Sequence, residues 1–111
     1  MKGVLPDVVR LEDIIEAIHD IEEHNHKDIS NKKTLQATLY CLTIIGEACS
    51  KLSTDLMDRY PEIPWKNIIN LRHRVVHDYG NVNVETVINV IEEYLPKLKQ
   101  SIRQILDDIK A

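Results

Sequence analysis

The sequence has few of the residues that mark membrane proteins, aromatic cores or nucleic-acid clamps. It contains no phenylalanine, and aromatic residues make up only 5% of it, so any core must be built mainly from Leu, Ile and Val. Its formal net charge is −4, which argues against a broad basic surface that holds nucleic acid, although it leaves room for a local phosphate site. No apolar run approaches the roughly 20 residues of a membrane span.

Cysteine is also scarce, with Cys41 and Cys49 as its two occurrences. On one helix their spacing corresponds to a rise of about 12 Å, which is too far for a disulfide. We therefore expect two reduced, buried thiols, as suits the cytoplasm. The N-terminus also lacks the pattern of a secretion signal, so we expect a soluble cytoplasmic protein.

The length of 111 residues, without repeats, linkers or low-complexity runs, predicts one domain over residues 1–111. Apolar residues recur at three- and four-residue steps in four stretches, and nowhere alternate as in a strand. The four predicted helices span residues 7–26, residues 30 or 31 to about 53, residues 64 to 78 or 79, and residues 82–111. A short helical turn is expected in the connector at 54–64, where two prolines exclude a long helix.

These elements predict an all-α fold, an antiparallel four-helix bundle with one additional short helix. Ser30 or Asn31 can cap the second helix, and Asn81 or Asn83 the last. Pro96 lies inside the last helix, so we expect that helix to be kinked or split near Pro96, at about residues 94–95.

Gly46 interrupts the second helix, where glycine costs about 1 kcal/mol relative to alanine. Its presence predicts a close approach by another helix. Glu47 follows directly, and it reads either as a polar group of a site or as an ordinary surface carboxylate. The apolar stripes of the second and last helices are also wider than one bundle core uses, which favours a dimer.

Residues 71–80 (LRHRVVHDYG) are the stretch that core and surface requirements do not explain. On a continuous helix His73, His77 and Tyr79 would lie about 100°, 140° and −20° from Arg72, within an arc of about 160°. Arg72 and His77 are not stacked in this arrangement. A working site would therefore need the helix end or a second subunit.

Arginine and histidine together suit phosphate chemistry. Arginine binds phosphate through two hydrogen bonds and stays charged, and histidine moves protons near neutral pH. Such groups can cleave RNA without a metal or other cofactor: a base activates the ribose 2′-hydroxyl, an arginine stabilises the developing charge, and an acid protonates the leaving oxygen.

Simpler interpretations stay open at this point. The stretch can be a solvated helix face on which Arg74 pairs with Asp78, its i+4 neighbour. Tyr79 can be an interfacial core residue. His73 and His77 have the i, i+4 spacing of a metal pair, but they would need a third ligand such as Asp78 or His19.

Residues 72–79 (RHRVVHDY) also match the R-x4-H-x-Y motif and resemble the HepT-like toxins of the HEPN superfamily. Residues 61–66 (PEIPWK) resemble the lead-in to the family's motif helix. Residues 46–48 (GEA), followed by Leu52, resemble its second-helix signature. The resemblance extends over nearly the whole chain.

The resemblance implies an all-helical homodimer with metal-independent endoribonuclease activity. Arg72 and His77 would be the catalytic pair, with His73, Arg74 and Glu47 in supporting positions. The implied partner is an MntA-like minimal nucleotidyltransferase that acts as antitoxin in a type VII pair. It would transfer AMP from ATP to Tyr79 and so block the toxin.

Two other functions compete with an RNase toxin. The chain could be a non-catalytic module that binds a nucleotide or the nucleotidyltransferase, or a plain oligomerising bundle. The first predicts a complex without RNA cleavage, and the second predicts no effect of changes at Arg72, His77 or Tyr79.

Overall fold

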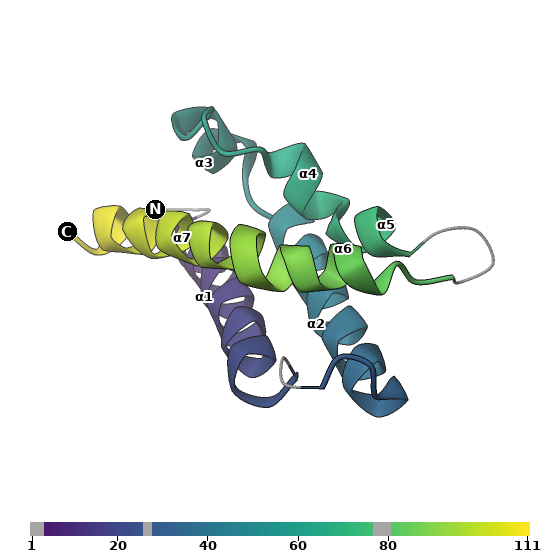
Figure 1. Ribbon diagram of the computed structural model, residues 1–111. Coiled ribbons are helices and arrows are strands. Elements are labelled where there is room, and N and C mark those ends of the chain that lie inside the picture. The colour runs from purple at the N-terminus through teal and green to yellow at the C-terminus, as the bar shows by residue number, and fades with distance from the viewer. Residues whose placement is uncertain (1–3, 26–27, 77–80) are drawn as a thin grey trace.

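The helices follow one another along the chain much as the apolar periodicity predicts (Figure 1). The structure is a computed structural model and describes residues 4–25, 28–76 and 81–111. Its elements are α1 (Val4–Asp20), η1 (Ile21–Asn25), α2 (Lys32–Ser50), α3 (Thr54–Arg59), α4 (Trp65–Ile69), α5 (Leu71–Val75), α6 (Val84–Asn89), η3 (Val90–Tyr94) and α7 (Leu95–Lys110), where η denotes a π-helical turn.

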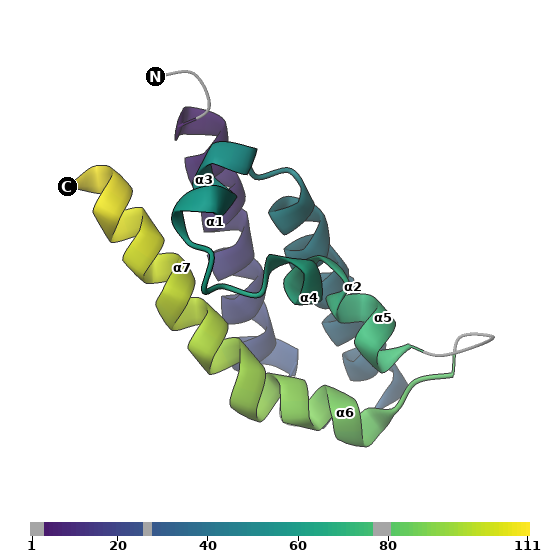
Figure 2. The same cartoon turned by 90° about the horizontal axis from the view of Figure 1, so that it is seen from above.

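α1 and α2 run antiparallel to each other (Figure 2), and the described residues form a helical bundle, which confirms the predicted all-α fold. α1 packs against α2 on one side and against α7 on the other, and α4 and α5 pack against α2. The short α3 is the predicted additional helix. None of the helices in the described ranges is both long and apolar enough to cross a lipid bilayer.

The core is aliphatic, as the absence of phenylalanine requires. The largest fully buried side chains come from every long helix. They are Leu11, Ile14, Ile18, Ile21, Leu42, Ile45, Ile68, Leu71, Val75, Leu95, Ile102 and Ile105. Cys41 and Cys49 are buried and are not joined by a disulfide, as their spacing predicts. Burial raises the pKa of the Cys49 thiol to about 12.

Side-chain caps set several helix starts. The Asn31 side chain accepts hydrogen bonds from the first turn of α2, and Asn83 does the same for α6. In both cases the structure selects one of the two predicted caps. At α3 the cap is Ser53, and the buried Asp7 of α1 accepts bonds from its backbone N–H at 2.8 Å and its hydroxyl at 2.6 Å. A buried carboxylate is thereby satisfied by hydrogen bonds.

The helix of residues 84–110 bends without splitting (Figure 2). The π-helical turn η3 precedes α7, and Pro96 lies in the first turn of α7. Proline has no N–H to donate, so a regular α-helical hydrogen bond is lost here, and the wider turn accommodates the ring. Of the two predicted outcomes near Pro96, the structure therefore shows the kink.

The predicted unbroken motif helix over residues 64–79 is wrong. Asn70, with φ −96° and ψ 18°, separates α4 from α5. α5 then ends at Val75, because Val76 has extended geometry (φ −107°, ψ 121°) and pairs with Val82 in an isolated antiparallel bridge. β-branched valines favour extended backbone, and the pairing stabilises it. The helical angles counted from Arg72 therefore do not extend to residue 77 and beyond.

Two smaller boundary predictions also shift. The first helix begins at Val4, before the predicted start at residue 7, with Pro6 in its first turn as expected. α1 ends at Asp20 and passes into the π-helical turn η1, whereas the prediction was one regular helix to residue 26. The predicted left-handed cap at Gly80 lies outside the described residues.

Candidate functional site

The site begins where α2 crosses the motif segment at Gly46. A Cβ atom at this position would lie 2.7 Å from the Ile69 carbonyl oxygen and 3.4 Å from that of Ile68. A side chain here would force α4 away from α2, since real Cβ atoms do not approach backbone this closely. The close helix approach predicted from Gly46 is thus confirmed. It brings residue 47 next to α5.

An open pocket with a volume of about 310 Å³ lies beside this crossing. Its lining includes polar side chains from two segments that are far apart in sequence. These are Glu47 on α2, and Arg72 and His73 on α5. Its lining residues are Leu42, Thr43, Gly46, Glu47, Ser50, Ile69, Asn70, Arg72 and His73. Glu47, Arg72 and His73 are exposed, so the pocket can receive a polymer without an opening motion.

The two basic side chains of the pocket, Arg72 and His73, are exposed and can reach a ligand. Among the described residues, neither Arg72 nor His73 forms an ion pair with a carboxylate, Glu47 included; the pair present is Lys99–Glu22 at 2.8 Å, on another face. An arginine in this state can use its planar fork of N–H donors on a phosphate.

Residues 77–79 complete the motif, and the backbone is anchored just before them and again at the start of α6. Val76 pairs with Val82, and the Asn83 N–H donates a 2.9 Å hydrogen bond to the Val75 carbonyl. His77 and Tyr79, the predicted acid–base residue and modification site, lie outside the described residues, as does Asp78. The described anchors fix where the chain leaves α5 and where it returns to α6.

Arg74 lies apart from the pocket. Its guanidinium carbon is 5.3 Å from the centre of the Tyr94 ring, a distance typical of a cation–π contact. The predicted Arg74–Asp78 ion pair cannot be compared, because residue 78 is outside the described range. The Tyr94 contact was missed by sequence reasoning, since no local pattern connects residues 74 and 94.

Other pocket residues were also missed. Asn70 and Ser50 line the pocket with polar groups. Asn70 ends α4 and directly precedes the stretch at residues 71–80, and that adjacency is the one signal that could have indicated it. A larger hollow of about 430 Å³ lies between the α3–α4 connection and α7, lined by Tyr60, Pro64, Gln100, Gln104 and their neighbours. It contains no residue of the predicted site.

Within residues 4–25, 28–76 and 81–111, no group of three or more His, Cys, Asp or Glu side chains is placed to hold a metal ion. The pairing of His73 with residue 77 that would begin such a site lies partly outside these ranges. His19, the other suggested ligand, is exposed on α1.

Comparison with known proteins identifies the family of this chain. The family model described as "Ribonuclease HepT-like" matches residues 10–105. The chain belongs to the HepT-like ribonuclease family. The matched region runs from α1 to α7, so it contains both the Gly46 crossing and α5. The family resemblance suggested by residues 46–48, 61–66 and 72–79 is therefore confirmed.

Similar proteins cover nearly the full chain. "Probable ribonuclease HepT" of Thermococcus cleftensis is 37% identical over 94 residues, which cover 80% of this chain and 86% of that protein. "Putative RNase MJ1216" of Methanocaldococcus jannaschii is 32% identical over 112 aligned positions, covering 100% of this chain and 91% of that protein. "Putative RNase MJ0125" of the same organism is 31% identical over 111, covering 99% and 94%. No solved structure matches the HepT-like chain.

Proposed function

We propose that this HepT-like chain is a metal-independent endoribonuclease and the toxin of a type VII HEPN/MNT toxin–antitoxin pair, acting on RNA in the cytoplasm. One observation carries the proposal. In a chain of a ribonuclease family, Arg72 and His73 from α5 and Glu47 from α2 line one open pocket at the Gly46 crossing. The groups differ in charge and proton affinity, as phosphodiester cleavage requires.

Arg72 and His77 carry the chemistry in this proposal. His77 removes the proton from a ribose 2′-hydroxyl, whose oxygen attacks the adjacent phosphorus. The bond from phosphorus to the 5′-oxygen breaks, and the leaving oxygen takes up a proton from the imidazolium or from water. The products are a 2′,3′-cyclic phosphate and a 5′-hydroxyl. Arg72 stabilises the negative charge that develops on the phosphoryl oxygens.

Three further residues support this pair. Glu47 and His73 line the same pocket as Arg72, where a carboxylate and an imidazole can orient the guanidinium and the bound ribose. Arg74 acts from outside the pocket. No metal or other cofactor takes part, because the arginine supplies the positive charge and histidine the proton transfer.

The first test is RNA cleavage by the purified protein in EDTA. His77→Ala and Arg72→Ala should each abolish cleavage while the far-UV circular dichroism stays unchanged. Arg103→Ala, at an exposed arginine of α7, is the matched control and should cleave like the original protein. Equal cleavage by His77→Ala would remove that residue from the mechanism.

Failure of the original protein to cleave any RNA would favour a different function. If it then formed a stable complex with a minimal nucleotidyltransferase, and Arg72→Glu disrupted that complex, the chain would be a non-catalytic binding module. A nucleotidyltransferase gene next to this one would support a toxin–antitoxin pair.

The proposed regulation acts on Tyr79. The tyrosine oxygen attacks the α-phosphorus of ATP in the MntA-like partner, a tyrosyl–phosphate bond forms, and pyrophosphate leaves. Intact-mass measurement after incubation with the partner, ATP and Mg²⁺ should show additions of AMP. Tyr79→Phe should not be modified, whereas Tyr40→Phe, at an exposed tyrosine of α2, should be modified normally. Modification that persists in Tyr79→Phe would move the acceptor elsewhere.

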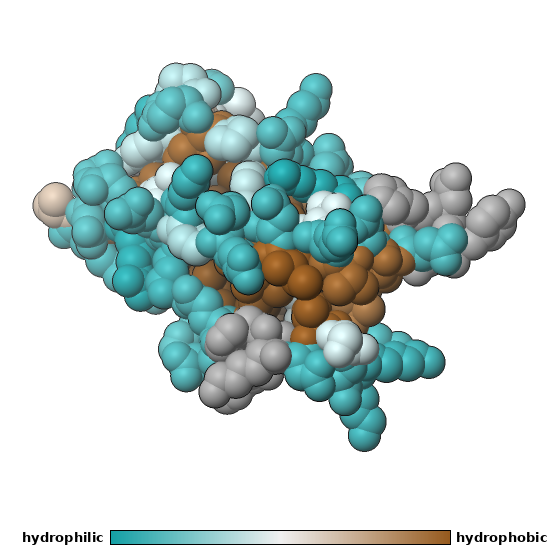
Figure 3. All heavy atoms as spheres, viewed as in Figure 1, coloured by the Kyte–Doolittle hydropathy of each residue, from teal (hydrophilic) through white to brown (hydrophobic). Residues whose placement is uncertain are grey.

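A homodimer is supported by apolar surface that the bundle leaves uncovered. Figure 3 shows a contiguous hydrophobic area over α6 and the neighbouring part of α2. Ile88 is 37% exposed, and Val84, Ile91, Leu35 and Leu39 are only partly buried. This matches the surplus of apolar residues predicted from the sequence, and burying it is favourable. Two copies would bring two pockets into one assembly.

The dimer is tested by light scattering after size exclusion. Ile88→Glu should yield a monomer, because it places a charge in the proposed interface. Val9→Glu is the matched control, since Val9 on α1 is 53% exposed and lies on another helix. Dissociation by both variants, or by neither, would argue against this interface.

A further inference from the structure

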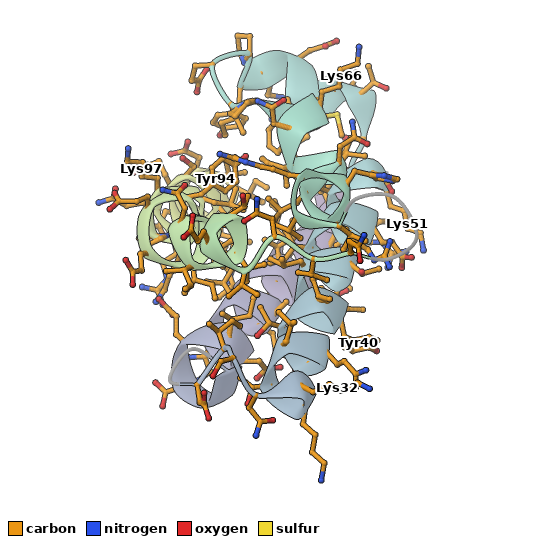
Figure 4. All side chains as sticks on the ribbon, turned by 45° about the vertical axis from the view of Figure 1, so that its right-hand side comes forward. Lys32, Tyr40, Lys51, Lys66, Tyr94 and Lys97 are labelled. Carbon is orange, nitrogen blue, oxygen red and sulfur yellow. The ribbon has the colours of Figure 1, made fainter. Side chains whose placement is uncertain are left out.

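Among the described basic residues of the motif, Arg72, His73 and Arg74, Arg74 is the one that does not line the pocket. Its guanidinium carbon lies 5.3 Å from the centre of the Tyr94 ring, which brings α5 into contact with the bend of the C-terminal helix. α6, which packs against α5, leads directly into η3, and Tyr94 is the last residue of η3 (Figure 4). The two residues are twenty positions apart in sequence, so this contact belongs to the tertiary structure.

Tyr94 also reaches into the interior of the bundle. It is half-buried, its hydroxyl oxygen is shielded from solvent, and that oxygen has no hydrogen-bond partner among the described residues. Burial raises the pKa of Tyr94, the Arg74 charge lowers it, and the buried Cys49 of α2 raises it. The Tyr94 ring therefore links α5 to η3, with its hydroxyl shielded from solvent and the Arg74 guanidinium over its face.

α5 needs such a support because it has only five residues. A helix this short is not stable by itself, so its orientation depends on tertiary contacts. Leu71 and Val75 are fully buried and fix its inner face. On helical geometry Arg72 and Arg74 lie about 200° apart, one on either flank of that inner face. A contact on the Arg74 flank therefore restricts rotation of the Arg72 flank.

We infer that Arg74 and Tyr94 form a positioning pair for the catalytic pocket, in which the guanidinium on the ring sets the rotation of α5 and so aims Arg72 and the chain that leaves Val76. This inference rests on the proposed function, adds Tyr94 to it and gives Arg74 a specific part. Neither residue touches the substrate. The π-helical turn has a structural part in this, because it ends at Tyr94 and determines where the ring lies relative to α6.

Single-turnover RNA cleavage tests the pair through four variants. Arg74→Ala and Tyr94→Leu should each lower the rate constant of cleavage by about tenfold, because small misplacements of catalytic groups are costly, while changing the RNA concentration for half-saturation less than about twofold. Arg74→Lys keeps the cation and Tyr94→Phe keeps the ring face, so both should stay within about threefold of the original rate. Tyr40→Leu, at an exposed tyrosine of α2, is the control for loss of an aromatic ring.

The double variant decides whether the residues act together. Since each change breaks the same contact, Arg74→Ala with Tyr94→Leu should be about tenfold slower, as either single variant is, rather than about a hundredfold. Independent effects that multiply would overturn the inference. So would a weaker, more salt-sensitive binding of RNA by Arg74→Ala at an unchanged cleavage rate, because that would make Arg74 a phosphate contact.

A second measurement separates this inference from the proposed function. Hydrogen exchange of the α5 amides does not require RNA cleavage, and in Arg74→Ala and Tyr94→Leu it should accelerate by about tenfold or more while exchange in α1 stays unchanged. If the original protein cleaves no RNA but α5 loosens in this way, the pair is confirmed and the catalytic proposal fails. Unchanged exchange in α5 would contradict the pair itself.

Discussion

The two flanks of α5 carry the same kind of side chain but meet different surroundings. On one flank Arg72 and His73 face an open pocket with Glu47. On the other, Arg74 lies over the Tyr94 ring, whose hydroxyl is shielded from solvent. All three basic side chains are exposed, so exposure alone does not separate them. The role of each basic residue of α5 therefore depends on the element that its side chain faces.

Substitution of Gly46 should have the largest effect, because it disturbs the support of both flanks. A Cβ at this position would meet the Ile69 backbone oxygen at 2.7 Å. Gly46→Ala should lower the free energy of unfolding by about 1–3 kcal/mol, since packed elements must separate. The measurement is urea denaturation. In an uncrowded helix the same change would raise stability by about 1 kcal/mol, and such a gain would show that the crossing is looser than described.

A control for Gly46 is available on the same helix. Ala37→Gly should report the ordinary propensity cost of about 1 kcal/mol. RNA cleavage by Gly46→Ala should fall even where the protein remains folded, because α4 and α5 move away from Glu47.

Substitution of Arg72 should affect only the flank of α5 that faces the pocket. Arg72→Ala is expected to reduce kcat/KM at least about a hundredfold, equivalent to roughly 2.7 kcal/mol of transition-state stabilisation. The melting temperature should stay within error, because the side chain is exposed. Arg72→Lys should recover only part of the rate, since lysine cannot bind phosphate through a planar fork. Full activity in Arg72→Lys would show that charge alone suffices.

The Arg74 flank can be separated from the Arg72 flank by stability measurements. A double-mutant cycle of Arg74→Ala with Tyr94→Leu should give a coupling of about 0.5–1 kcal/mol, as for an exposed cation over an aromatic ring. The equivalent cycle of Arg72→Ala with Tyr94→Leu should give none. Equal coupling in both cycles would mean that the flanks are not distinct.

Substitution of the buried Cys49 of α2 should have the smallest effect at neutral pH. Its folded-state pKa of about 12 exceeds the usual value of 9.0 because of burial. The stability contributed by the neutral thiol is therefore complete below pH 9 and is lost as the pH rises from 9 toward 12. The free-energy difference between the original protein and Cys49→Ala should narrow over this range. A constant difference would show that the thiol ionises as readily in the folded state.

Much of the fold was predictable because it depends on local patterns. The apolar stripes, the caps at Asn31 and Asn83, and the bend near Pro96 each reflect the chemistry of neighbouring residues. Gly46 was also informative, since an interior helix glycine is unfavourable unless another backbone needs the space. The same patterns placed Glu47, Arg72 and His73 among the candidates that the pocket now brings together.

The end of the motif helix was not predictable from these patterns. Residues 71–79 have helical spacing, but the pairing of Val76 with Val82 and the bond from Asn83 to Val75 end α5 early. Such contacts depend on where the chain returns after residue 80. Local propensity is weaker than these tertiary contacts when the helix is only five residues long.

The sequence by itself therefore determined the long helices, the aliphatic core and the family, because each depends on short-range periodicity or on a contiguous motif. Only the tertiary structure decided that Glu47 lines one pocket with Arg72 and His73, and that Arg74 lies over the Tyr94 ring. These contacts join residues 20 or more positions apart. They form because Gly46 allows two backbones to approach and because the bend at η3 brings an aromatic ring beside α5.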